Sequence, residues 1–170
     1  DFDYVMNQFF ILDSNTETNA QQISGTRFLG EDLSIKQDSK VPQILIYHTH
    51  SQETFADSRE GKEEDTIVGV GNYLTNLLEE KYGYQVIHVT DAFDMMGGTL
   101  DRSKAYDYAR ISIEKVLEEN PTVEVVIDLH RDGVPDDRRL VTEVNGKSTA
   151  QLLFYNGLSY TVNQLSLIHI

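Results

Sequence analysis

Two short polar segments of the sequence carry residue types that bind metal ions. The first, HTHSQE at 48–53, places His50 and Glu53 three residues apart, directly after the apolar run QILIYH. The second, DLHRD at 128–132, places His130 directly after the apolar run VEVVIDL. Two neutral imidazoles and one carboxylate form a ligand set typical of catalytic zinc, which keeps a fourth position open for water. Zinc in such a site acidifies water and polarises a carbonyl group. We predict that His50, Glu53 and His130 bind zinc.

The polar residues beside these ligands have several possible roles. His48 could be a fourth ligand, or it could orient a ligand imidazole, because strand alternation would place it on the same side as His50. Asp128 could orient a ligand in the same way. Arg131 and Asp132 could bind a substrate carboxylate or pair with each other. We take His48, Arg131 and Asp132 as the catalytic candidates.

Other histidines, serines and glycines of the chain are better explained without chemistry. His88, inside VIHV, is expected to be a hydrogen-bonded residue of a sheet. Gly69 and Gly71 lack the pattern of a dinucleotide-binding loop and are expected to allow a helix to pack closely on a sheet. Ser51 and Ser58 lack the sequence of a nucleophile elbow.

The composition excludes several classes of function. The chain has 14 basic and 28 acidic residues, a net charge of −14, which disfavours binding to nucleic acid and to anionic membranes. It has no cysteine, so any zinc must be bound by His, Asp or Glu. The sequence contains no run of 18 apolar residues, the length that a membrane-spanning helix needs. Because the chain begins at Asp1 and not at Met, we expect a fragment whose upstream part holds an anchor.

The hydrophobic pattern predicts alternating strands and helices. Apolar runs predict strands at 43–48, 84–89 and 123–129, and helical periodicity predicts helices at about 65–82 and 102–119. Two shorter strands, 138–144 and 149–155, flank the turn signal Asn145-Gly146. This order predicts an α/β domain with a mainly parallel sheet flanked by helices, which binds ligands beyond the carboxyl ends of its strands. We place the domain at 41–164, after a polar linker or extension at 1–40.

Two segments that contain the predicted ligands resemble the stage II sporulation protein P family: PQILIYHTHSQETFADS and VEVVIDLHRDGV. Four other segments resemble it too: DTIVGVGNYL, YGYQVIHV, RSKAYDYAR and NGKSTAQLLFYNGLS. The resemblance covers about residues 8–160. It implies a fold of the hydrolase type found in zinc N-acetylmuramoyl-L-alanine amidases. It also implies cleavage of the amide between glycan strand and stem peptide in peptidoglycan, with an endopeptidase activity. The implied setting is the intermembrane space of a sporulating bacterium during engulfment, with a membrane anchor and with sporulation proteins D and M as partners.

The resemblance also bears on the ligands. It implies His50 and His130 as the first two zinc ligands. Related amidases would place the third at Glu63 or Glu64, whereas the H-x-x-E spacing, similar to that of zinc carboxypeptidases, selects Glu53, which we prefer. Two alternatives to a peptidoglycan hydrolase stay open: a non-catalytic, zinc-containing wall-binding module and a metallocarboxypeptidase-like peptidase.

The end of the sequence departs from the family pattern. The family domain should continue past residue 160 to a strand that bears a glutamate acting as general acid or base, so we expect the domain to be incomplete at its carboxyl end. The final residues, LSLIHI at 165–170, read like the translation of a sequencing adapter, and we expect them to be a non-native tail.

Overall fold

A computed structural model describes residues 1–12, 17–135, 137–156 and 168–169 of the chain. The chain divides into two units, 1–36 and 37–170, each described here by itself. No helix within these described residues is both long enough and apolar enough to cross a membrane.

The first unit contains two short helices in the segment that was expected to be a polar linker or extension. Helix α1 (Phe2–Phe9) begins after Asp1, whose side chain accepts a hydrogen bond from the Asp3 N–H. Helix α2 (Gly25–Gly30) begins after Ser24, whose hydroxyl accepts one from the Arg27 N–H. Such caps satisfy backbone donors at a helix start, which explains how a polar segment forms helices.

The second unit is built on a mainly parallel sheet. Strand β1 (Pro42–Tyr47) lies between β2 (Gln85–His88) and β5 (Val125–Asp128) and is parallel to both. Beyond β5 lie β9 (Ile168–His169), which is parallel to it, and β8 (Tyr155–Asn156), which is antiparallel to β9. The α/β class and the parallel pairing of the three predicted strands are confirmed.

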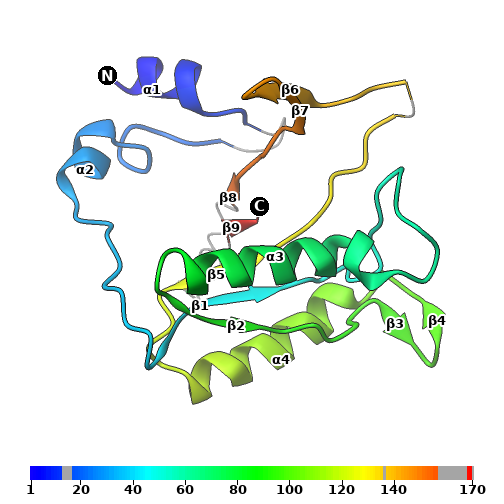
Figure 1. Ribbon diagram of the computed structural model, residues 1–170. Helices are drawn as coiled ribbons and strands as arrows, with labels where there is room; N and C mark the ends of the chain where they lie inside the picture. Colours follow the sequence, from blue (N-terminus) through cyan, green and yellow to red (C-terminus); the bar gives the residue numbers. More distant parts are fainter. Residues whose placement is uncertain (13–16, 136, 157–167, 170) are drawn as a thin grey trace. The chain divides into compact units, whose positions relative to one another are not determined.

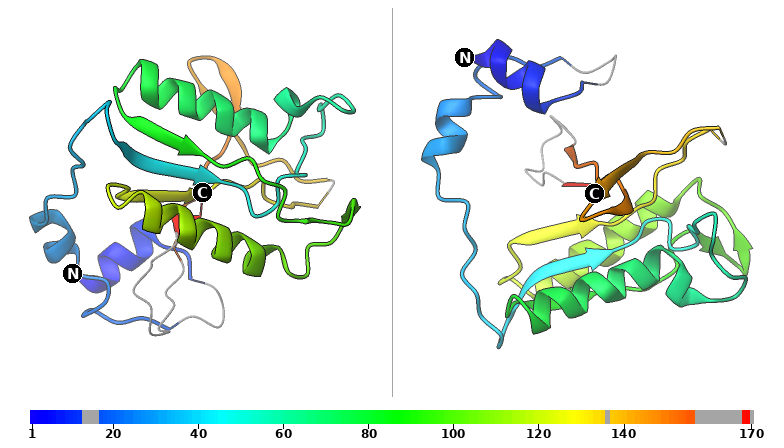
Figure 2. Two further views of the ribbon diagram at one scale, coloured as in Figure 1. Left: turned by 90° about the horizontal axis from the view of Figure 1, so that it is seen from below. Right: turned by 45° about the horizontal axis from the view of Figure 1, so that its top comes forward.

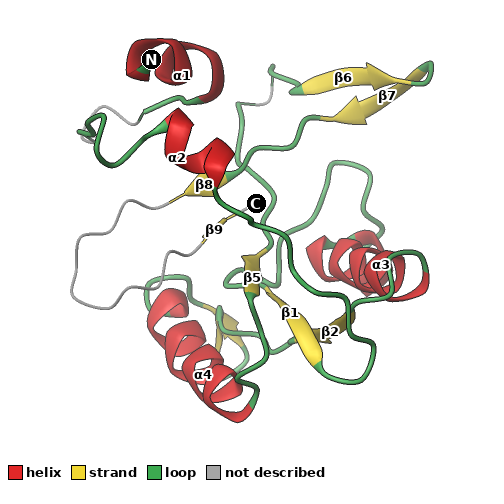
Figure 3. Cartoon of the chain, turned by 90° about the vertical axis from the view of Figure 1, so that its left-hand side faces the viewer, coloured by secondary structure: helices red, strands yellow, loops and turns green. Residues whose placement is uncertain are grey.

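Two helices cover opposite faces of this sheet. Helix α3 (Ile67–Glu80) lies on one face and α4 (Ala105–Glu119) on the other (Figures 1 and 2). Alternate residues of β1 face the two helices because side chains along a strand alternate in direction. Leu45 and Tyr47 pack in the core cluster that includes Ala109 and Ile113 of α4. The view along the sheet shows β1, β2 and β5 between the two helices (Figure 3).

The smaller elements lie in the connections. They are the 3-10 turn η1 (Glu63–Asp65) and the strand pairs β3 (Met95–Met96) with β4 (Thr99–Leu100) and β6 (Val141–Val144) with β7 (Lys147–Ala150). Asn145 and Gly146 have φ of 53° and 74°, which confirms the predicted two-residue hairpin turn. The strand expected at 149–155 instead begins at Lys147, since so short a turn returns the chain to pairing at once. Of the predicted tail, only Ile168 and His169 lie within the described residues, as β9.

Gly71 provides a test of how closely α3 packs on the sheet. A Cβ added there would lie 2.6 Å from Nε2 of His88 and 2.7 Å from Nε2 of His48. Alanine usually stabilises a helix relative to glycine by up to about 1 kcal/mol, but overpacking costs about 1–3 kcal/mol. We expect Gly71→Ala to lower the free energy of unfolding, measured by urea titration. Gly133→Ala, where no atom lies within 4 Å, is the control. An unchanged or higher stability of Gly71→Ala would contradict the close contact.

Candidate functional site

A tight turn brings His50 and Glu53 together at the carboxyl end of β1. The strand ends at Tyr47, and the Glu53 N–H donates to the His50 carbonyl oxygen at 3.2 Å. Because this hydrogen bond closes a four-residue turn, the residues at the first and last positions of H-x-x-E lie beside each other. Glu53 is only 6% exposed although it is charged. The two residues of the H-x-x-E spacing therefore lie together in one turn.

His130 lies between two carboxylates. Its Nε2 is 2.9 Å from Oδ1 of Asp128, and its Nδ1 is 3.6 Å from Oε2 of Glu53. Asp128 is completely buried, and it also accepts hydrogen bonds from the N–H and hydroxyl of Thr49 at 2.9 and 2.5 Å. Asp128 thus fixes the imidazole in the way that was considered for it, and one nitrogen of the ring faces Glu53.

The charge on His130 follows from these contacts. Burial opposes protonation, but the hydrogen bonds and charges of Asp128 and Glu53 outweigh it and raise the pKa of His130 to about 9. Burial would likewise raise the pKa of Glu53, but His130 and the Arg131 N–H outweigh it and lower that pKa. The site at neutral pH therefore contains an imidazolium held by two carboxylates.

His50 completes the cluster from the other loop. Its ring centroid lies 5.4 Å from that of His130, in an edge-to-face arrangement. Burial, and secondly the nearby His130, lower the pKa of His50, so this imidazole is neutral. Its Nδ1 is buried and has no hydrogen-bond partner in the part of the chain that the structure describes. A buried imidazole nitrogen without a partner is the kind of atom that a metal ion would satisfy.

His48 lies on the other side of the sheet from His50. It is fully buried, its Nδ1 donates to the Leu129 carbonyl at 2.9 Å, and its Nε2 lies 2.8 Å from Nε2 of His88 near α3. His50 instead packs against Tyr106 of α4. The expectation that the two histidines share a side differs from the structure because β1 ends before His48, so strand alternation does not extend to His50. His88 is a hydrogen-bonded sheet residue, as predicted.

Arg131 and Asp132 do not pair through their charged groups. The Arg131 guanidinium donates to the backbone carbonyls of Thr54 at 3.0 Å and of Asp132 at 3.3 Å, and the Arg131 N–H donates to Glu53 at 2.7 Å. Arg131 therefore holds the loop that contains Glu53 against the end of β5. The Asp132 side chain is exposed next to the site.

The structure also identifies two residues that the sequence analysis did not select. Asp94 is completely buried and accepts hydrogen bonds from the Ser51 hydroxyl at 3.1 Å and the Gln52 N–H at 3.4 Å. Tyr106 packs edge-on to His50 at 5.4 Å and stacked with His130 at 6.4 Å. Asp94 follows β2, so its position after a third parallel strand was a usable signal. Tyr106, at the start of α4, carried no such signal.

The competing third ligands lie elsewhere. Glu63 and Glu64 are exposed in η1, and Glu64 is 3.5 Å from Arg59. The structure therefore brings Glu53, and neither of these glutamates, to His130. Within the described residues, no three His, Asp or Glu side chains already surround a position where a metal ion would fit. The donor types suit zinc, but His130 directs its two nitrogens at carboxylates.

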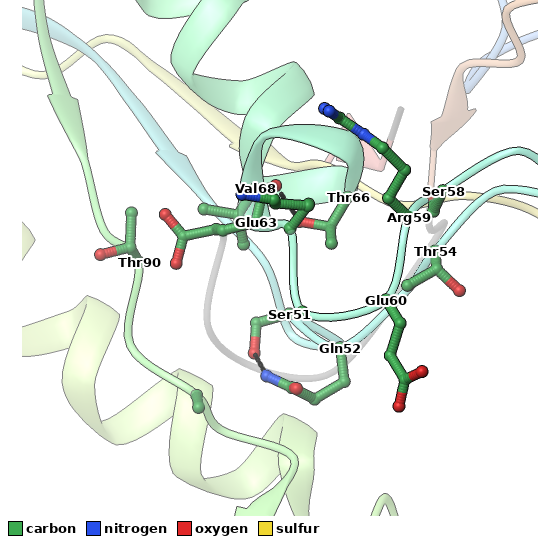
Figure 4. A pocket seen from close by; sticks show the side chains of 13 residues that line it. Ser51, Gln52, Thr54, Ser58, Arg59, Glu60, Glu63, Thr66, Val68 and Thr90 are labelled. Carbon is green, nitrogen blue, oxygen red and sulfur yellow. Dashed lines mark hydrogen bonds between the residues drawn. The ribbon is translucent and has the colours of Figure 1, made fainter.

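An open depression of about 600 Å³ lies along the loop that follows β1, the loop that contains Glu53 (Figure 4). Hydroxyl and amide side chains line it, together with charged groups of both signs; the polar members are Ser51, Gln52, Thr54, Ser58, Arg59, Glu60, Lys62, Glu63, Thr66 and Thr90. Ser51, Gln52 and Thr54 are the sequence neighbours of Glu53. The three predicted ligands themselves do not line the depression.

Comparison with known proteins gives a family match over most of the chain. The profile of the family described as stage II sporulation protein P matches residues 8–164. The chain is 26% identical over 129 residues to the stage II sporulation protein P of Bacillus subtilis (strain 168). The aligned region covers 71% of this chain and 31% of that protein. The chain therefore spans about a third of the length of that relative. No solved structure matches the chain.

Asp128 provides a test of how the site is held together. We expect Asp128→Ala to lower the free energy of unfolding by about 3 kcal/mol, because it leaves the buried Thr49 N–H without its acceptor and removes a partner of charged His130. Urea denaturation measures the change. The exposed neighbour Asp132 is the matched control, and its replacement by alanine should cost less than about 0.5 kcal/mol. Equal losses in the two variants would contradict the role assigned to Asp128.

Proposed function

Because the chain belongs to the stage II sporulation protein P family, we propose that it is a zinc-dependent peptidoglycan hydrolase with His50, Glu53 and His130 as its metal ligands. The family is one of sporulation, and a cell-wall hydrolase is consistent with it. The observation that supports zinc binding is the meeting of these three side chains at the carboxyl ends of β1 and β5. Ligand sites of parallel sheets lie at this edge.

The donor set suits zinc in number and kind. His50 offers a buried Nδ1 without a hydrogen-bond partner among the described residues, and His130 and Glu53 face each other across 3.6 Å. A cation could replace the proton that now holds His130 and Glu53 together, because both groups then act as donors of electron pairs. Zinc bound there would supply a Lewis acid for the scissile carbonyl and an activated water.

The chain's own residues would hold and shield this centre. Asp128 orients His130 through Nε2 and leaves Nδ1 for the metal, an arrangement typical of zinc sites. The Arg131 N–H fixes one oxygen of Glu53. The half-exposed ring of Tyr106 lies against both imidazoles and would limit the access of solvent to them. Of the three catalytic candidates, Asp132 is the exposed one, and we assign it to contact with substrate.

The substrate and setting form part of the same proposal. The bond cleaved would be the amide between glycan strand and stem peptide, with cross-linked stem peptides as a further substrate. The protein would act outside the cytoplasm of a sporulating cell, anchored in the membrane by a segment of the full-length protein, with sporulation proteins D and M as partners. The amidase-type architecture belongs to this proposal too.

Zinc content tests the ligand set. We expect His50→Ala and His130→Ala to lose bound zinc, because each removes one of three donors. Glu53→Gln should weaken zinc binding more than Glu63→Gln or Glu64→Gln, since an amide is a poorer ligand than a carboxylate. Metal analysis and competition with a chelator measure both effects. Stoichiometric zinc in either histidine variant, or a larger loss at Glu63 or Glu64, would overturn the assignment.

Digestion of purified sacculi tests the reaction. We expect the zinc-loaded full-length protein to release stem peptides with a free N-terminal alanine, which is the product of amide cleavage next to the glycan. Free amino groups within cross-links would instead indicate an endopeptidase, and loss of a single C-terminal residue would indicate a carboxypeptidase. His130→Ala is the inactive control. Binding to sacculi without any product, by protein that contains zinc, would favour a wall-binding module and contradict the proposal.

A further inference from the structure

A chain of hydrogen bonds crosses the sheet beneath the candidate site. It starts at the side-chain amide oxygen Oδ1 of Asn72 on α3, which lies 3.1 Å from Nδ1 of His88 on β2. His88 Nε2 lies 2.8 Å from Nε2 of His48, and His48 Nδ1 lies 2.9 Å from the carbonyl oxygen of Leu129. Leu129 directly precedes His130, so the chain connects α3 to the backbone that carries a predicted ligand.

The Leu129 carbonyl at one end fixes the direction of these hydrogen bonds when both rings are neutral. A carbonyl oxygen only accepts, so His48 Nδ1 must carry a proton and donate to Leu129. The Nε2 of a neutral His48 is then an acceptor, and His88 Nε2 must donate to it. His88 Nδ1 is left as an acceptor, so the Asn72 amide must turn over and present its NH₂ group at the position where Oδ1 is placed. The oxygen and nitrogen of a side-chain amide have nearly the same shape, so this exchange leaves the contact unchanged. Burial, and secondly the neighbouring His48, lower the pKa of His88 to about 4, in agreement with a neutral ring.

Helix α3 packs directly against the rings of His48 and His88 and leaves no room for another ligand of their nitrogens. Gly71 lies over both rings, and even a Cβ at this position would approach each Nε2 to less than 3 Å. His48 is completely buried, so water does not compete for its nitrogens. The pair is therefore closed on the helix side and engaged at every ring nitrogen, which leaves His48 no nitrogen for a metal ion.

We propose that His48 and His88 form a neutral, directionally ordered imidazole pair that positions the Leu129–His130 backbone, and that neither residue binds metal. The inference rests on the proposed function for its effect on zinc, but the hydrogen-bond order does not depend on zinc. His48 is thereby a positioning residue. Its action passes through the Leu129 carbonyl, and the His88 contact holds the ring in the orientation that this hydrogen bond needs.

Two variants of His48 separate this role from simple core packing. In His48→Asn the amide NH₂ takes the place of Nδ1 and can still donate to Leu129. In His48→Gln the amide reaches the place of Nε2, so it can contact His88 but loses Leu129. Both variants remove part of the ring, so urea denaturation should show losses of stability of similar size. We expect His48→Asn to keep zinc affinity within about threefold and His48→Gln to lose about 10–100-fold.

A second measurement needs no metal. The Arg131 N–H donates to Glu53 next to the positioned segment, so its hydrogen exchange, followed by NMR in the presence of a chelator, reports whether the end of β5 is held. Exchange should accelerate in His48→Gln and stay near the parent rate in His48→Asn. Equal exchange in the two variants, or complete loss of zinc from His48→Asn, would overturn the inference. A parent protein without zinc would instead refute the proposed function, while the exchange experiment would still decide the role of His48.

Discussion

The contact of one imidazole with two carboxylates is the interaction on which the candidate site depends. His130 lies between Asp128 of its own strand and Glu53 of the loop after the neighbouring strand. The parallel register, in which Tyr47 is opposite Asp128, sets the two strand ends level, so the loops that leave them must meet. The buried charges are tolerable because each has several partners. Thr49 donates two further hydrogen bonds to Asp128, and the Arg131 N–H donates one to Glu53. The same contacts make the two loops mutually dependent.

The two histidines of HTH, His48 and His50, have different surroundings because β1 ends at Tyr47 and the chain then turns away from the strand direction. His48 directly follows the last residue of β1, and both of its ring nitrogens make hydrogen bonds within the protein. His50 lies in the turn, faces α4, and keeps a buried nitrogen without a partner among the described residues. One tripeptide thus places an imidazole with both nitrogens engaged on one face of the sheet, and an imidazole with an unengaged buried nitrogen on the other.

The sequence predicted the elements whose patterns are local. The apolar runs that became β1, β2 and β5 are short and continuous, and the Asn145-Gly146 turn needs the positive φ that both residues adopt. The meeting of His50, Glu53 and His130 was also predictable, since all three follow strands of one parallel sheet. The side of the sheet that His48 occupies was not, because alternation holds only while the strand lasts. Asp94 and Tyr106 were missed because their roles come from packing between distant segments. Helices α1 and α2 were missed because their capping residues outweigh the polar composition of the segment.

The position of the site at the edge of the sheet limits what could react there. Glu53 and Asp94 hold the turn from within, Tyr106 covers the imidazoles from α4, and the depression along the loop that follows β1 is open and lined mainly by polar side chains. A polymer such as peptidoglycan cannot enter a closed cavity, whereas it can lie across an open edge and present one amide bond to it. Hydroxyl and amide side chains suit sugars and peptides, which offer hydrogen-bonding groups along their whole length. In the proposed hydrolase, rigidity would come from beneath the edge, where the buried hydrogen bonds of Asp128, Asp94 and His48 lie.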